Sequence, residues 1–499
     1  MNVYRAINAL LDYGVSRGLL KAEDRVYSRN MLLHELRLDS FTDEHAEGEF
    51  PLEDILAVLL DDACARGVCD DSVTFRDLLD AKLMDCLMPR PSEVIAKFRA
   101  DYAESPEKAT DNYYKFSRDT DYIRRYRIRN DIKWVTKTEY GDIDITINMS
   151  KPEKDPRLIK LAGKAGKAEK YPACALCAEN EGYYGRVDNA GRSSHRMIPI
   201  KVQGQDWFFQ YSPYVYFNEH SIFLNAVHTP MIIDRNVFIK LLDIIKFLPH
   251  YFVGSNAGLP IVGGSILAHE HFQGGRYEFA MAKAPVERGF SMAGFPDISA
   301  GIVKWPMSVI RVSGADPDRV VDAADKILKT WKGYTDESAF IFANTDGEEH
   351  NTVTPIARKR GDNYEIDLVL RNNTVTDEYP DGLYHAHPEY HHIKKENIGL
   401  IEVMGLAVLP SRLKYEMEAL QTALLEGADL RADDGTAKHA DWAEDIAAKH
   451  PEMNSDNIGG IFRDEIGLVF TEILGNCGVF KRTEEGMKQF DRFVSALSV

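Results

Sequence analysis

The chain has 499 residues, of which 44% are apolar and 28% charged, and its formal net charge is −18. This composition is typical of a globular protein with a large core, and the acidity disfavours binding to nucleic acid, although local Lys and Arg can still form a positive pocket. No apolar run is long enough for a membrane span, the first residues do not form a secretory signal, and six cysteines in so long a chain do not indicate a disulfide framework, so we expect a cytoplasmic protein.

The N-terminal part is expected to be helical. Apolar residues recur at three- and four-residue spacing over 5–20, 43–67 and 74–88. A further helix is expected over 105–128, because Ser105 suits an N-cap and Pro106 suits the first helical position.

Strands are expected from residue 142 onward. Residues 142–150 alternate apolar and polar side chains, as a half-buried strand does. Further predicted strands lie at 206–217, 220–227, 263–275, 307–314, 338–345, 364–373 and 398–410. Amphipathic helices are expected at 234–252 and 318–334, and in the tail at 413–427, 439–450, 461–475 and 484–498. Gly427 and Gly475 stand at the expected helix C-caps.

This mixture of strands and helices predicts the α+β class. We divide the chain into a helical N-terminal region (1–135), a first sheet-containing half (136–290), a second sheet-rich half (291–420) and a helical C-terminal region (421–499).

The segment 263–275, "GGSILAHEHFQGG", is the most informative part of the sequence. Read as an extended strand, it places His269, His271 and Gln273 on one face. The glycine pairs at both ends allow the backbone to approach a bulky group such as a phosphate. A lone histidine in a strand is usually a packed residue, but two histidines and a glutamine between glycine pairs favour a functional site.

Cys174 and Cys177 form a C-x-x-C pair in a loop-like setting. Such a short turn brings two sulfur atoms together and supplies half of a tetrahedral metal site. His228 and His269 are the candidates for the other two ligands, with His220 as the alternative to His228. A redox pair or a metal-free pair is the competing interpretation.

The histidine segment resembles the histidine-triad superfamily, and within it the galactose-1-phosphate uridylyltransferases of the bacterial type-2 form. The resemblance covers about residues 122–416 and also includes "YIRRYRIRNDIKW", "ITINMSKPEKDPR", "CALC", "YFNEHSIFLNAVHTPM" and the stretch from His385 to Met417. The sequence departs from the better-known form at Glu270, where that form has proline.

The resemblance implies two halves, each an antiparallel sheet with a helix, and an exchange of UMP between UDP-glucose and galactose 1-phosphate in galactose metabolism. His271 is implied as the nucleophile that carries UMP in a ping-pong mechanism, and Gln273 as a hydrogen-bond donor to the phosphoryl group. It also implies a homodimer that binds UDP-sugars and hexose 1-phosphates.

The resemblance further implies a zinc site of Cys174, Cys177, His228 and His269, and a set of substrate contacts. The candidates for substrate binding are Gly263, Gly264, Ser265, Asn256, Lys154 and Arg412. Lys154 stands where the family has an arginine, and lysine binds phosphate as a point charge. For these residues, turn formation or a solvated charged face is the competing interpretation, as it is for the basic cluster Arg124, Arg125, Arg127 and Arg129.

A second histidine strand is expected around His385 and His387. It suggests a second metal site with His350 and Glu287, a contact to the sugar phosphate, or histidines at a subunit or domain contact. Two other functions stay open: a hydrolase or phosphorylase of the same superfamily, and a zinc-bound nucleotide-sensing protein that is not an enzyme.

Overall fold

The computed structural model describes residues 1–150, 171–264 and 266–498. Contacts divide the chain into two compact units. The first unit comprises Met1–Asn130, Ser150–Val215 and Glu219–His228, and the second comprises Asp131–Met149, Tyr216–Asn218 and Thr229–Val499. The predicted four-part division has other boundaries, and it stays a prediction.

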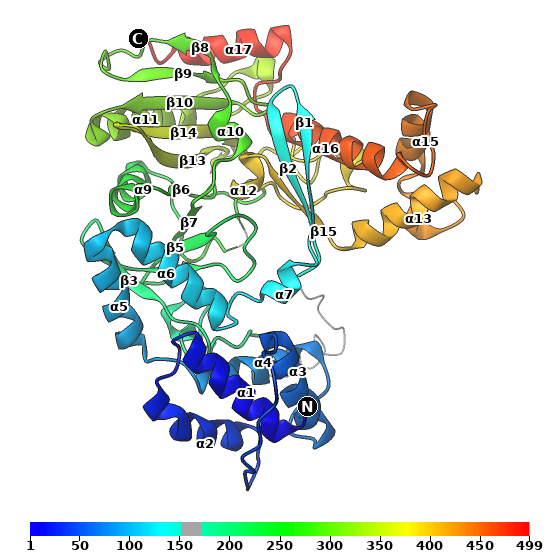
Figure 1. Cartoon of the computed structure of the whole chain (residues 1–499). Coiled ribbons are helices and arrows are strands. Elements are labelled where there is room, and N and C mark those ends of the chain that lie inside the picture. Colours follow the sequence, from blue (N-terminus) through cyan, green and yellow to red (C-terminus); the bar gives the residue numbers. More distant parts are fainter. Residues whose placement is uncertain (151–170, 265, 499) are drawn as a thin grey trace. The chain divides into compact units, whose positions relative to one another are not determined.

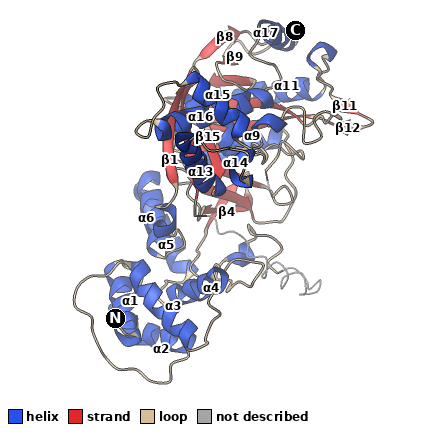
Figure 2. Ribbon diagram, turned by 90° about the vertical axis from the view of Figure 1, so that its right-hand side faces the viewer, coloured by secondary structure: helices blue, strands red, loops and turns tan. Residues whose placement is uncertain are grey.

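The first unit begins with a helical bundle and continues with three antiparallel strands in the order β3-β4-β5 (Figures 1 and 2). A core of Leu, Ile, Ala and Met side chains from α1 to α4 holds the bundle together. The elements are α1 (Val3–Ser16), α2 (Arg25–Glu35), α3 (Leu52–Ala65), α4 (Val73–Asp85), α5 (Pro91–Glu104), α6 (Pro106–Asp119), α7 (Arg125–Ile128), β3 (Ile198–Val202), β4 (Gln205–Tyr211) and β5 (Ser221–Asn225).

Local capping explains where several of these helices begin. The Ser105 hydroxyl accepts the backbone N–H of Lys108, and Pro106 occupies the first position of α6, as predicted. α1 begins in the same way, because the Asn2 side chain accepts the N–H of Arg5.

The second unit contains a run of antiparallel strands in the order β7-β6-β13-β14-β10-β9-β8. The long hairpin β13–β14 lies near its middle, and the helices α9 and α11 pack together and against β13 (Figure 1). The elements are α9 (Arg235–Phe247), β6 (Phe252–Gly254), β7 (His271–Gly275), α10 (Ala280–Lys283), β8 (Val286–Phe290), β9 (Ser299–Val303), β10 (Val309–Gly314), α11 (Pro317–Lys332), β13 (Asn351–Arg360) and β14 (Asn363–Asn372).

A second sheet of this unit joins distant parts of the sequence. β1 and β2 form an antiparallel hairpin, and β15 adds to β2 in parallel. The helix α16 packs against β1. The remaining elements are β1 (Ile132–Thr138), β2 (Gly141–Asn148), the two-residue strands β11 (Asn344–Thr345) and β12 (Glu348–Glu349), α12 (Leu400–Val403), β15 (Leu406–Pro410), α13 (Arg412–Glu426), α14 (Asp434–Ala437), α15 (Ala440–Lys449), α16 (Ile458–Cys477) and α17 (Glu484–Ser495).

The α+β class is confirmed, and most predicted elements are present, but several details were wrong. Of the predicted strand 338–345 only Asn344–Thr345 form a strand, β11, and 398–410 is a short helix, α12, followed by β15. The second histidine segment is not a strand, because residues 385–387 are irregular. Gly427 does end α13 in the left-handed conformation, whereas Gly475 lies inside α16 and Gly478 is its C-cap.

Candidate functional site

The histidine segment is a turn followed by a strand, not the single strand that the sequence predicted. β7 begins only at His271, and residues 267–269 bend. Two backbone bonds fix the bend, because Met231 N–H donates to the Leu267 carbonyl and Glu270 N–H donates to the Thr229 carbonyl. His269 and His271 therefore do not project from one continuous strand.

The bend sets the tautomer of His271. The Nδ1 atom of His271 lies 2.7 Å from the carbonyl oxygen of His269, and a carbonyl can only accept, so Nδ1 carries the proton. In the neutral ring the Nε2 atom then holds the lone pair. Burial lowers the pKa of His271 below its usual 6.5, because a buried cation loses hydration. His271 is therefore a neutral imidazole with a nucleophilic Nε2 atom at pH 7.

Asn256 packs directly beside the glycine pair. Its Oδ1 atom accepts the backbone N–H of Leu400 at 2.9 Å, and its side chain is buried. A Cβ atom at Gly264 would lie 2.4 Å from Nδ2 of Asn256, and one at Gly263 would lie 2.6 Å from two backbone carbonyl oxygens. Both glycines are thus required for close packing of the chain itself around Asn256.

Glu270, the residue between His269 and His271 in the sequence, forms a buried ion pair. The Nζ atom of Lys240, on α9, lies 2.5 Å from the Glu270 carboxylate, and the two side chains are only 13% and 9% exposed. The ion pair links the Glu270 side chain to α9. The sequence analysis missed Lys240, which lies beside the buried face of the helix predicted at 234–252.

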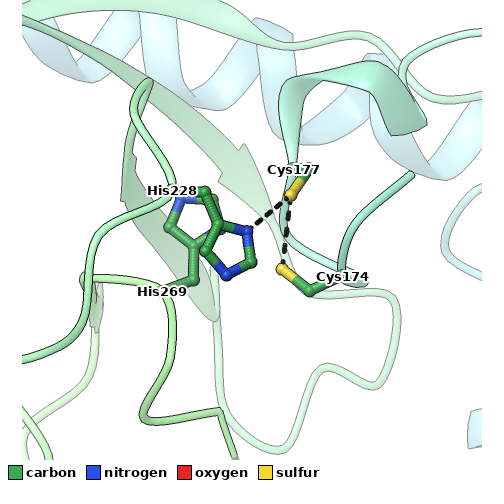
Figure 3. Close-up of side chains that lie close together, drawn as sticks. All are labelled: Cys174, Cys177, His228 and His269. Atoms are coloured by element: carbon green, nitrogen blue, oxygen red, sulfur yellow. Dashed lines mark hydrogen bonds between the residues drawn. The ribbon is translucent and has the colours of Figure 1, made fainter. Parts of the chain in front are cut away.

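Four side chains form a group with metal-binding geometry (Figure 3). One ligand atom from each of Cys174, Cys177, His228 and His269 lies within 4.8 Å of the other three. The Sγ atoms are 3.5 Å apart, and Nδ1 of His228 is 3.1 Å from Sγ of Cys177. The group contains His228 and not the alternative, His220.

The loop that carries the cysteines fits a metal ion. Ligand atoms around tetrahedral zinc are about 3.5–3.8 Å apart, given the usual Zn–S and Zn–N distances, which is close to the separations found here. The N–H of Leu176 points to the Cys174 sulfur at 3.4 Å, and the Asn180 amide donates to the carbonyl oxygens of both cysteines. These bonds hold the turn in a conformation that keeps the two sulfur atoms close together.

The second histidine segment does not assemble a comparable group. His385 bonds to Asn397, His387 bonds to the Leu383 carbonyl and His350 bonds to Asn373. Glu287 forms an ion pair with Arg482. Among the described residues, these side chains do not have the spacing of metal ligands.

The arginines that the sequence analysis named as candidates form ion pairs. Within the first unit, the four arginines at 124, 125, 127 and 129 each pair with an acidic side chain. Arg412 contacts Glu416 at 2.6 Å and the His392 carbonyl at 3.0 Å. Ser265 and Lys154 lie outside the described residues. Gln273 lies in β7 opposite Gly254 of β6.

Among the residues that the structure describes, no helix combines the length and apolarity needed to cross a bilayer.

Known proteins match almost the whole chain. Models of the N-terminal and C-terminal domains of galactose-1-phosphate uridyl transferase match residues 20–230 and 245–444. Galactose-1-phosphate uridylyltransferase of Clostridium acetobutylicum is 50% identical over 98% of this chain and 99% of its own. The enzymes of that name from Halalkalibacterium halodurans and Bacillus subtilis are 49% and 46% identical, and each alignment covers at least 98% of either chain.

Among solved structures, yeast Ap4A phosphorylase aligns with a TM-score of 0.32 and 13% identity, over 64% of this chain and 96% of that one. The assignment of this chain to a family rests on the two domain models and on the relatives that align over nearly their full length. The chain belongs to the galactose-1-phosphate uridylyltransferase family of nucleotidyltransferases.

Proposed function

We propose that this protein exchanges UMP between UDP-glucose and galactose 1-phosphate through a covalent uridylyl group on His271. The observation that carries the proposal is the bond between Nδ1 of His271 and the His269 carbonyl, because it leaves Nε2 unprotonated. Family membership supports the substrates, since the named relatives are galactose-1-phosphate uridylyltransferases.

The first step uses the Nε2 lone pair as nucleophile. Nε2 attacks the α-phosphorus of UDP-glucose, the N–P bond forms, and the bond from phosphorus to the bridging oxygen breaks. Glucose 1-phosphate leaves with that electron pair. In the second step a phosphate oxygen of galactose 1-phosphate attacks the same phosphorus, the N–P bond breaks, and UDP-galactose forms. The two steps are the reverse of one another with different sugars, and so one site serves both.

Other residues prepare the site for this attack. Gln273, two residues after His271 on β7, is proposed to donate a hydrogen bond to a non-bridging phosphoryl oxygen. Asn256, Gly263, Gly264, Ser265, Lys154 and Arg412 remain the proposed substrate contacts. For Asn256, its packing beside Gly264 and its bond to Leu400 support a role in shaping the site.

Zinc is the proposed occupant of the Cys/His group. Two thiolates and two imidazoles are the donor set of structural zinc sites, in which all four positions are filled by protein. Such an ion would fix His269, whose carbonyl orients the nucleophile, and it would take no part in the chemistry. A cytoplasmic location and a homodimer are proposed on the sequence and on family grounds.

An exchange assay separates the proposal from its alternatives. The protein is incubated with UDP-glucose and radiolabelled glucose 1-phosphate, without galactose 1-phosphate. The covalent route predicts that label enters UDP-glucose, because the first step runs backwards. A His271→Ala variant should lose this exchange, whereas a Glu287→Gln variant, changed outside the site, should keep it. Absence of exchange despite normal synthesis of UDP-galactose would contradict the covalent route, and release of UMP without an acceptor would indicate a hydrolase.

A further inference from the structure

Two cysteines at the end of α3, in the first unit, lie in contact. The Sγ atoms of Cys64 and Cys69 are 3.0 Å apart, and both cysteines are free. Because a disulfide bond is about 2 Å long, a shift of about 1 Å is enough for the two sulfur atoms to bond. Neither residue belongs to the Cys/His group, and neither has a part in the proposed uridylyl transfer.

The turn that ends α3 brings the two cysteines together. The N–H of Gly67 donates to the Cys64 carbonyl, and the N–H of Val68 donates to the Ala63 carbonyl. Gly67 has a φ of 71°, in the left-handed region that glycine adopts without strain. These two bonds and the left-handed glycine form the Schellman motif, which reverses the chain at the end of a helix. The motif therefore returns Cys69 to the last turn of α3.

Arg76, on α4, bonds to both sides of this turn. Its Nη1 atom donates to Asp61 of α3 at 2.8 Å, and its Nε atom donates to Asp71 at 2.6 Å. Asp61 precedes Cys64 on the helix, and Asp71 follows Cys69 after the turn. The arginine thus keeps the segment that carries Cys69 beside the helix that carries Cys64.

The pair is open to small reagents and lacks the further ligands of a metal site. Both cysteines are partly exposed. Within residues 1–150, 171–264 and 266–498, no third histidine, cysteine or carboxylate lies close enough to complete a metal-binding group with them. Two adjoining thiols without a metal ion can be oxidised to a disulfide, and disulfides of reducing compartments are mostly of this redox-active kind.

We propose that Cys64 and Cys69 form a redox modification site, which a low-molecular-weight disulfide such as oxidised glutathione converts reversibly to a disulfide. The Cys64 thiolate attacks one sulfur of oxidised glutathione, a mixed disulfide forms, and one glutathione leaves as a thiolate that takes up the proton lost by Cys64. The Cys69 thiolate then attacks the Cys64 sulfur, the bond between the two cysteines forms, and the second glutathione leaves in the same way. The protein loses two electrons and two protons, and one oxidised glutathione becomes two reduced ones.

The surroundings of Cys69 set the order of the two attacks. Burial raises the pKa of the Cys69 thiol to about 12, and its hydrogen bond with Cys64 adds to the effect. Cys69 is therefore almost fully protonated at pH 7, and a protonated thiol is not a nucleophile. The first attack is assigned to Cys64, and Cys69 acts as the resolving thiol once Cys64 carries the glutathione.

Peptide mapping with trypsin tests the pair, because Arg66 lies between the two cysteines in the sequence. The full-length protein is incubated with oxidised glutathione, its remaining thiols are alkylated, and it is digested with trypsin. Cleavage after Arg66 separates Cys64 from Cys69, so we expect peptides 38–66 and 67–76 to stay joined until a reductant is added. Cys86, whose sulfur bonds to the Lys82 carbonyl, is the internal control and should not enter a linked peptide.

Serine variants test the order of the two attacks. In Cys69→Ser the resolving thiol is absent, so we expect the mixed disulfide with glutathione to accumulate at Cys64. In Cys64→Ser we expect Cys69 to remain a free thiol. Serine is close to cysteine in size and both positions are partly exposed, so both variants should fold. The proposal is overturned if the unaltered protein yields no linked peptide, and the order of attack is overturned if Cys69 captures glutathione as readily as Cys64.

Discussion

At the scale of single residues, the protonation of His271 decides when the protein can react. The proposed nucleophile is the neutral imidazole, and burial lowers the pKa of His271 below 6.5. Lowering the pH therefore removes activity only below about pH 6.5, once the ring becomes protonated. We expect the rate constant kcat/KM for UDP-glucose to be unchanged from pH 8 to about 6.5. A fall in kcat/KM on acidification with its midpoint above pH 6.5 would contradict a lowered pKa of His271.

Gly264 offers a second test at this scale. In a Gly264→Ala variant the new Cβ atom would meet the Asn256 amide at 2.4 Å, so Asn256 has to move and its bond to Leu400 is disturbed. We expect a loss of kcat/KM of about tenfold or more, as a displacement near 1 Å produces. Gly460→Ala is the control, because a Cβ there meets nothing within 4 Å. Equal activity of the two variants would show that the close packing at Gly264 has no role.

At the scale of elements, the ion pair between Lys240 and Glu270 joins α9 to the residue that precedes β7. Glu270→Gln leaves a buried ammonium without its carboxylate, and we expect the free energy of unfolding to fall by about 3 kcal/mol. The double variant Lys240→Met with Glu270→Gln should be more stable than Glu270→Gln alone, since the uncompensated charge is gone. Urea unfolding measures both, and a double variant less stable than Glu270→Gln alone would contradict the pairing.

The elements predicted correctly are those with strong local signals. α6, α9 and α11 have capping residues at their starts and a regular apolar spacing, and both signals act within a few residues. The errors arose where the conformation depends on contacts with residues far away in the sequence. Pairing of residues 267–270 with 229–231 bends the histidine segment, and neither partner is visible from the segment itself.

Two further errors have local causes. The apolar run 398–410 suggested one strand, but Glu402 caps the N–H of Gly399 and Gly405 adopts a positive φ of 104°. The strand β13 was not predicted, and it contains Pro355, which lacks the N–H of a central strand. β6 pairs only with Ile356–Arg358, and so the ladder ends before Pro355.

The sequence predicted some features of the candidate site and not others. The C-x-x-C spacing indicated two ligands of the Cys/His group, and the family resemblance pointed to His228 and His269 as the other two. The bond from His271 to the His269 carbonyl was not predicted, because it depends on the bend. The arginines at 124–129 could not be recognised as paired, since their acidic partners lie as many as 76 residues away in the sequence.

At the scale of the whole molecule, metal removal should lower stability. Dialysis of the purified protein against a zinc chelator is expected to lower the melting temperature Tm, and added zinc should restore it, because the ion binds the folded state. Cys177→Ser should contain less zinc by elemental analysis, whereas Cys86→Ser, changed outside the group, should keep it. Equal zinc content in the two variants would contradict the proposed site.

The central claim is that His271 carries UMP between two sugar phosphates, and intact-protein mass spectrometry tests it most directly. The protein is mixed with UDP-glucose, glucose 1-phosphate is removed enzymatically, and the reaction is quenched at alkaline pH, where an N–P bond survives. We expect the mass to increase by one uridylyl group, located at His271 by peptide mapping and discharged by galactose 1-phosphate. An active protein that gains no such mass, or that gains it at another residue, would contradict the account.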